Sequence, residues 1–142
     1  MNANLPLTRI SPTSTEVDFL EDRLYEHNCQ ATGKEDGQLF GFLVRDEQGA
    51  IVAGLSGWTW AGACEIRTLW VDAACRGQGY GRRLIAAAED EARAHACRIV
   101  LLTTYSFQAP EFYRKLGYET AGRVDGFPPG HQHHILLKRL EE

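Results

Sequence analysis

A cluster of glycines and arginines at residues 76–83 is the part of the chain best suited to bind an anion. Its sequence is RGQGYGRR, and an apolar-periodic segment follows it directly. Glycines let the backbone turn so that successive N–H groups point inward, and a helix start adds about half a positive charge. The spacing G-x-G-x-G is neither the dinucleotide pattern G-x-G-x-x-G nor the P-loop G-x-x-x-x-G-K-[ST]. The loop therefore predicts a polyphosphate site that is neither of these two common nucleotide sites.

The residues before this loop have the alternation of a strand. Residues 64–72 read CEIRTLWVD, and a period of two places alternate side chains on opposite faces. One predicted face carries Glu65, Arg67, Leu69 and Val71, and the other carries Ile66, Thr68 and Trp70. The anion-binding loop thus follows a strand and precedes a helix.

Two motifs in the chain share a pattern with one enzyme superfamily. Arg76-x-x-Gly79-x-Gly81 follows a strand that contains Leu-x-Val, and residues 112–118 read FYRKLGY. The first resembles motif A, [RQ]-x-x-G-x-[GA], of the GNAT superfamily of acetyl-CoA-dependent N-acetyltransferases, and the second resembles the later GNAT motif Y-x-K-x-G-[FY]. The order and separation of the motifs also agree. The resemblance covers essentially the whole chain and implies a single acetyltransferase domain over residues 1–142.

The resemblance implies an α/β (α+β) fold with one mixed, mostly antiparallel sheet, splayed central parallel strands and flanking helices. Periodicity and turn residues predict the elements independently. Strands are expected at 5–10, 39–45, 51–60, 64–72, 99–102, 118–124 and 133–140. Helices are expected from a Thr13–Glu16 capping box to about His27, from the glycine loop to about His95, and from Pro110 to Gly117, with a loop or second short helix at 28–37. The strand at 99–102 follows a crossover helix, so it should lie parallel to the strand before the loop.

By resemblance, the cofactor is acetyl-CoA, used as a cosubstrate. The backbone of the Leu69–Val71 segment would contact the acetyl and pantetheine portions, and loop N–H groups would bind the pyrophosphate. GNAT proteins often have an asparagine at the position of Ser106, where a hydroxyl, or the neighbouring Gln108, could replace the amide. The implied cofactor-binding residues are Leu69, Trp70, Val71, Arg76, Gly77, Gln78, Gly79, Tyr80, Gly81, Arg82, Ser106 and Gln108.

Two side chains are candidates for proton transfer. Tyr113 matches the general-acid tyrosine of the family, since a phenol with a pKa of about 10 can protonate a departing thiolate. The alternative is a core tyrosine that packs on Phe112. Glu65 is the candidate base for a protonated primary amine, and the alternative is a strand-face carboxylate paired with Arg67. Cys64 and Cys75 lie near the predicted site and could be reactive.

Composition and net charge limit the kinds of partner and the cellular location that we expect. The net charge of -4 argues against nucleic acid, no segment resembles a secretory signal or a membrane span, and four cysteines without a C-x-x-C pair favour a reduced cytoplasmic protein. His131, His133 and His134 lack nearby cysteines, so we expect a solvated turn entering a strand, with His133 and His134 on opposite faces, and no metal site.

The predicted activity is acetyl transfer to a primary amine of a small molecule or peptide by direct attack in a ternary complex. Residues 25–37, 58–60 and 125–134 would form the acceptor side, and their carboxylates and aromatic rings favour a cationic amine. The alternative is a non-catalytic acetyl-CoA-binding sensor or regulatory module. A homodimer is expected only from the family.

Overall fold

A computed structural model describes residues 4–141. The chain divides into two compact units, one up to Glu35 and the other from Asp36 onward. The single domain predicted over residues 1–142 stays a prediction.

The first unit contains helix α1 (Thr15–Thr32). The predicted capping box is wrong, because the N-cap is Ser14 and its side chain makes no capping hydrogen bond. The helix also continues past His27, since the next breaker is Gly33, which adopts a left-handed φ of 73° and donates its N–H to the Cys29 carbonyl. Residues 5–10 form no strand, because none of the strands in residues 4–141 pairs with them. None of the helices in that range is long and apolar enough to cross a membrane.

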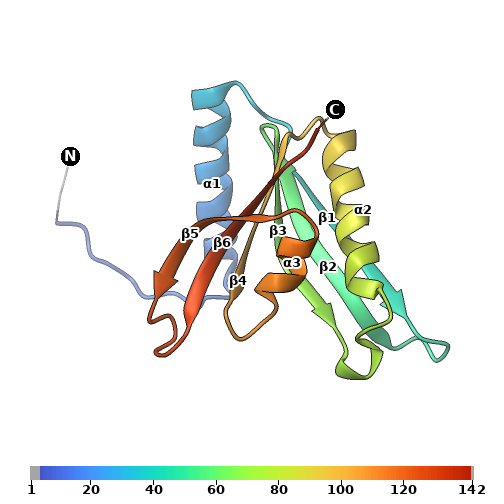
Figure 1. The fold of residues 1–142 in the computed structure, drawn as a ribbon. Helices are drawn as coiled ribbons and strands as arrows, with labels where there is room; N and C mark the ends of the chain where they lie inside the picture. Colours follow the sequence, from blue (N-terminus) through green and yellow to red (C-terminus); the bar gives the residue numbers. More distant parts are fainter. Residues whose placement is uncertain (1–3, 142) are drawn as a thin grey trace. The chain divides into compact units, whose positions relative to one another are not determined.

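The second unit is built on one six-stranded sheet of order β1-β2-β3-β4-β6-β5 (Figure 1). Its strands are β1 (Gln38–Arg45), β2 (Ile51–Trp60), β3 (Ala63–Val71), β4 (Ile99–Tyr105), β5 (Glu119–Asp125) and β6 (Gln132–Arg139). The β3–β4 pair is parallel and the other pairs are antiparallel. These pairings confirm the predicted fold class, including the parallel pair around the crossover helix.

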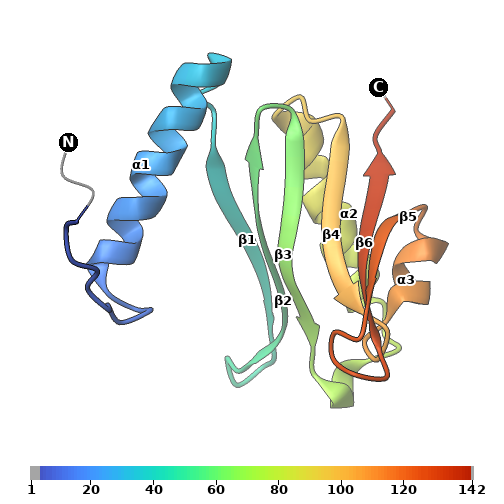
Figure 2. The same cartoon turned by 90° about the vertical axis from the view of Figure 1, so that its left-hand side faces the viewer.

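Two helices of this unit pack against the apolar core. After a short 3₁₀ turn, η1 (Ala73–Cys75), helix α2 (Tyr80–Ala94) runs along the sheet (Figure 2), and α3 (Pro110–Lys115) follows β4. α2 buries Leu84, Ile85 and Ala88 in the same cluster as β-strand side chains such as Val100 and Leu102. This arrangement places the start of α2 just beyond the end of β3.

A bulge in β3 reverses the side-chain alternation on which the sequence prediction rested. Ser56 pairs with Thr68 and Gly57 with Ile66, so Arg67 is an extra residue in β3. Beyond it, Leu69 lies opposite the core residue Leu55 and packs against the core. The prediction that Leu69 and Val71 share a face with Glu65 is therefore wrong, and so is the shared face of Ile66, Thr68 and Trp70.

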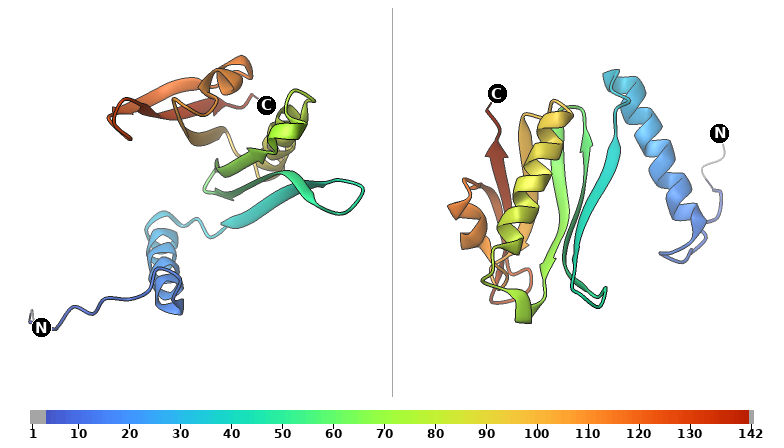
Figure 3. Two further views of the ribbon diagram at one scale, coloured as in Figure 1. Left: turned by 90° about the horizontal axis from the view of Figure 1, so that it is seen from below. Right: turned by 90° about the vertical axis from the view of Figure 1, so that its right-hand side faces the viewer.

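The bulge lies where the two parallel strands separate. β3 and β4 pair only through residues 63–65 and 99–101, although β3 continues to Val71 and β4 to Tyr105. Looking along the strands, β3 and β4 diverge (Figure 3). This divergence matches the expected splay and leaves backbone groups of both inner edges unpaired with each other.

A buried polar network joins α2 to the last strands. The Tyr118 hydroxyl donates to Glu89 at 2.9 Å, and the Lys138 ammonium donates to both carboxylate oxygens of Glu89 at 3.0 and 3.1 Å. Burial, together with the Glu89 carboxylate, raises the pKa of the Tyr118 phenol. Tyr118 also donates its N–H to the Tyr113 carbonyl, so the network anchors the end of α3 to the core.

The bulge requires glycine at position 57. A Cβ on Gly57 would lie 2.5 Å from the Glu65 carbonyl oxygen and 2.9 Å from the Phe40 ring. We expect Gly57→Ala to lower the free energy of unfolding by roughly 1–3 kcal/mol, because backbone must shift to admit the methyl group. The measurement is denaturant unfolding at 25 °C.

Gly122→Ala is the matched control on β5. Its Cβ would meet only the Ile135 side chain, at 3.4 Å, so its stability should stay equal or rise slightly. Equal stabilities of the two variants would show that the close approach at Gly57 does not constrain the bulge.

Candidate active site

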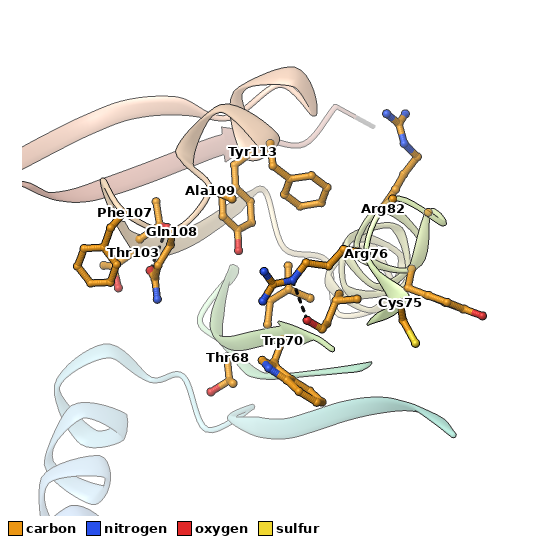
Figure 4. Close-up of a pocket in the computed structure, with 18 of the residues that line it drawn as sticks. Thr68, Trp70, Cys75, Arg76, Arg82, Thr103, Phe107, Gln108, Ala109 and Tyr113 are labelled. Carbon is orange, nitrogen blue, oxygen red and sulfur yellow. Dashed lines mark hydrogen bonds between the residues drawn. The ribbon is translucent and has the colours of Figure 1, made fainter. Parts of the chain in front are cut away.

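A cavity of about 780 Å³ lies where β3 and β4 diverge (Figure 4). Its walls come from the end of β3, the start of α2, the end of β4 and α3. Most of the predicted site residues line it: Leu69, Trp70, Val71, Arg76, Gly77, Gly79, Tyr80, Gly81, Arg82, Gln108 and Tyr113. Gln78, Ser106 and Glu65 do not. The cavity has the size of an ordinary small-molecule site.

The glycine loop, predicted to bind an anion, and the first turn of α2 form one end of the cavity. Gly79 is the N-cap residue and has a left-handed φ of 87°, a conformation that favours glycine. The first N–H groups of a helix have no acceptor within it and carry its positive dipole end. Arg76 donates from Nε to the Val71 carbonyl at 3.1 Å, which ties the loop to the end of β3. Arg82, in the first turn of α2, also lines the cavity, although its guanidinium points away from the other lining side chains (Figure 4).

Tyr113 projects from α3 into the same cavity, with its hydroxyl toward the open space (Figure 4). Its ring packs edge-on against Phe112 and Tyr118, with centroid separations of 5.1 and 6.1 Å. Tyr113 thus packs against Phe112, as the core interpretation predicts, and also lines the cavity. Burial raises the pKa of the Tyr113 phenol, so the group stays protonated across the physiological range.

Glu65 lies beside the main cavity. It lines a smaller cavity of about 210 Å³ that shares Arg67 and Thr103 with the larger one. Its carboxylate lies 3.5 Å from the Arg67 Nε and accepts a hydrogen bond from Trp58 Nε1 at 3.3 Å. The predicted alternative, an ion pair between Glu65 and Arg67, is therefore present. Because Glu65 is half exposed, the pairing does not close the carboxylate off from solvent.

Polar side chains in the loop after β4 form hydrogen bonds that stabilise the conformation of the loop. Gln108 Oε1 accepts hydrogen bonds from the Thr104 hydroxyl at 3.1 Å and from the Tyr105 N–H at 2.8 Å. Ser106 Oγ accepts from the Gln132 N–H at 3.0 Å and lies 3.3 Å from His131 Nδ1. Cofactor contacts by Ser106 and Gln108 stay predictions.

Cys64 and Cys75, the two cysteines near the site, differ in their burial. Cys64 is fully buried, and burial raises the pKa of its thiol to about 12, so almost no thiolate exists near neutral pH. Cys75 is only partly buried and lines the cavity. The structure therefore removes Cys64 from the candidate nucleophiles.

The histidine cluster has a role in packing that the sequence did not reveal. His133 stacks on Tyr105 at 4.4 Å, whereas His134 is buried, in agreement with the predicted opposite faces. The expectation of a solvated turn does not hold for His134. Among residues 4–141, no group of three or more His, Cys, Asp or Glu side chains is arranged to hold a metal ion.

The cavity residues that the sequence did not assign to the site include Arg67 and Phe107, as well as Thr68, Thr103 and Thr104. Arg67 was placed on a regular strand face, and the bulge that turns it toward the cavity has no clear sequence signal other than Gly57 opposite. Phe107 lies in a loop and belongs to neither motif. Its position between the end of β4 and α3 was the available signal.

Comparison with known proteins agrees with this geometry. The family model for GNAT acetyltransferases matches residues 6–118. The chain belongs to the GNAT family. Its GNAT relatives include a blasticidin-S acetyltransferase from Streptomyces morookaense, 43% identical over 98 residues, which cover 66% of this chain and 70% of the relative. A second relative, acetyltransferase Atu2258 from Agrobacterium fabrum, is 29% identical over 96% of this chain and 99% of its own length.

A solved GNAT-like structure gives the same result for the fold. The crystal structure of an acetyltransferase from Bacillus cereus is 34% identical, with a TM-score of 0.80, and the match covers 94% of this chain and 98% of that one. Family membership and these named relatives establish this GNAT protein as an acyltransferase.

Proposed function

We propose that the protein transfers an acetyl group from acetyl-CoA to a primary amine by direct attack in a ternary complex. The observation that carries the proposal is the meeting of three features in one cavity: the diverging β3 edge, the glycine loop at the start of α2, and Tyr113. The diverging edge can pair with an extended pantetheine arm, while the backbone N–H groups of Gln78, Gly79, Gly81 and Arg82 would bind the pyrophosphate. An N–H of the Leu69–Val71 segment would stabilise the developing oxyanion.

Two side chains would handle the protons. Glu65, directly or through water, would take a proton from the ammonium form of the acceptor, leaving a neutral amine to attack the thioester carbonyl carbon. The C–N bond forms, the C–S bond breaks, and the leaving thiolate takes the phenolic proton of Tyr113. The amine nitrogen, which becomes positively charged on attack, releases its second proton to the resulting phenolate and so restores the Tyr113 phenol. The pKa of Tyr113, raised by burial, keeps that proton in place until it is needed.

The acceptor is proposed to be a small-molecule amine, with a peptide amine as a broader possibility within the same chemistry. The name of the Streptomyces relative makes blasticidin S the first compound to test. A protein that bound CoA but transferred no acetyl group would instead be the sensor or regulatory module considered from sequence.

The proposal predicts release of free CoA thiol from acetyl-CoA only when an acceptor amine is present. The screen uses blasticidin S, simple alkyl and aryl amines, polyamines and lysine-containing peptides, with thiol release followed colorimetrically. Mass spectrometry of the product should show a gain of one acetyl group. CoA binding without release by any amine would contradict the enzymatic proposal.

Tyr113→Phe tests the general acid. We expect kcat to fall by about 100-fold, the lower range for general acid catalysis, while the dissociation constant for CoA stays unchanged. The raised pKa of Tyr113 also predicts that the wild-type rate shows no alkaline loss from this group below about pH 10.

Tyr118→Phe is the matched control, because it removes a neighbouring buried hydroxyl that donates to Glu89 and does not line the cavity. It should lower stability far more than kcat. Near-normal turnover by Tyr113→Phe would exclude the assigned acid.

Glu65→Gln tests the base. A protonated carboxyl cannot accept a proton, so wild-type kcat/KM should fall at acid pH, and the variant should lose that acid limb along with activity. Arg67→Met breaks the same ion pair but keeps the carboxylate, and it should retain the acid limb. An unchanged acid limb in Glu65→Gln would assign the proton transfer to another group.

A further inference from the structure

A stack of three aromatic rings stands beside the cavity at the end of β4. The Tyr105 ring stacks on Phe107 with centroids 5.2 Å apart and planes 9° apart, and on His133 at 4.4 Å and 16°. Phe127 and His131 contact this stack from the side, His131 edge-on to Phe107 at 5.1 Å. Phe107 is the end ring, and its side chain is the member of the stack that lines the cavity.

The position of Phe107 relative to the proposed chemistry is specific. In Figure 4, Tyr113 lies between Phe107 on one side and Arg82 on the other. Arg82 belongs to the phosphate-binding end, so Phe107 lies beyond Tyr113, where the acceptor must approach. Phe107 remains 55% exposed even though it stacks on Tyr105, and this leaves ring surface available to a ligand.

The loop that holds Phe107 is fixed before any ligand binds. Gln108 donates its N–H to the Tyr105 carbonyl at 2.9 Å, and its side-chain oxygen accepts from the Tyr105 N–H at 2.8 Å. On the other side, Ser106 donates its N–H to the Gln132 carbonyl at 2.8 Å. A ring held in this way loses little freedom when a second ring stacks on it, and this favours affinity.

The charges around the cavity select against a cationic group at this position. Within the sheet unit, residues 36–141, those lining the larger cavity include Arg67, Arg76 and Arg82 but no Asp or Glu. Asp36 and Asp125, two acidic residues of this unit in the segments expected on the acceptor side, therefore do not line this wall. An uncharged planar ring can stack on Phe107 without desolvating a charge.

From these observations we infer that the acceptor amine carries an uncharged aromatic or heteroaromatic ring, and that this ring stacks on the exposed face of Phe107. The inference rests on the proposed acetyl transfer and names the substrate class of the same site. Phe107 thereby acts as a specificity-determining residue and takes no part in proton transfer.

The test compares 2-phenylethylamine with 2-cyclohexylethylamine, which share the same ammonium group and chain length and differ in the planarity of the ring. Calorimetric titration into the CoA-saturated protein measures binding without turnover. We expect the phenyl compound to bind about three- to tenfold more tightly, in line with the energy of an aromatic pair beyond its buried area.

Phe107→Leu should abolish this preference, whereas Phe107→Trp, which keeps an aromatic ring, should retain it. Phe127→Leu is the matched control, because Phe127 contacts the stack and is also half exposed but does not line the cavity; it should keep the preference. Equal affinities in the wild type, a preference that survives Phe107→Leu, or no binding of either amine would overturn the inference.

Turnover is measured separately, so that the two proposals can fail independently. Release of CoA at equal kcat/KM with both amines would retain acetyl transfer and remove the ring-stacking site. A ring preference that depends on Phe107, in a protein that releases no CoA with any amine, would retain the binding site and remove the transfer.

Discussion

The short parallel pairing of β3 with β4 is the constraint on which the site depends. Three residues on each strand pair before β3 takes in the extra residue Arg67 and the strands diverge. A continuous ladder would satisfy the inner-edge backbone groups within the sheet and close the cavity. Gly57, where a Cβ would meet the Glu65 carbonyl oxygen, lets β2 follow the bulge closely.

The positions of the other elements around the cavity depend on this divergence of β3 and β4. The end of β3 leads through η1 to the glycine loop, and Arg76 ties that loop back to Val71. On the far side, β4 leads to Phe107 and to α3 with Tyr113. The network of Glu89, Lys138 and Tyr118 holds α2 and the end of α3 to one core. The two ends of the cavity, proposed to bind the anionic donor and the acceptor, are therefore connected through packed elements.

The polarity of the cavity wall also differs from one end of the cavity to the other. The end proposed to bind phosphate has arginines and helix N–H groups, the centre has the partly buried phenol of Tyr113, and the other end has Phe107, the last ring of the aromatic stack. Such a gradient suits a long anionic donor at one end and an uncharged planar group at the other. Glu65 lies at the last paired position of β3 with β4, contacts Arg67 and Trp58, and lines the smaller cavity beside the larger one.

The sequence alone determined the glycine loop, the Tyr113 motif, the strand and helix order after residue 38, and the parallel central pair, because each has a local pattern of glycine spacing or apolar periodicity. It misplaced the faces of Leu69 and Val71 because one extra residue reverses an alternation that a period-two reading carries forward. The sequence also did not reveal that Arg67 and Phe107 line the cavity. Their positions depend on contacts between β2, β3, β4 and β6. Motifs thus indicated the family and the proposed donor, and only the tertiary structure brought together the side chains proposed to meet the acceptor, because that wall is assembled from segments distant in the chain.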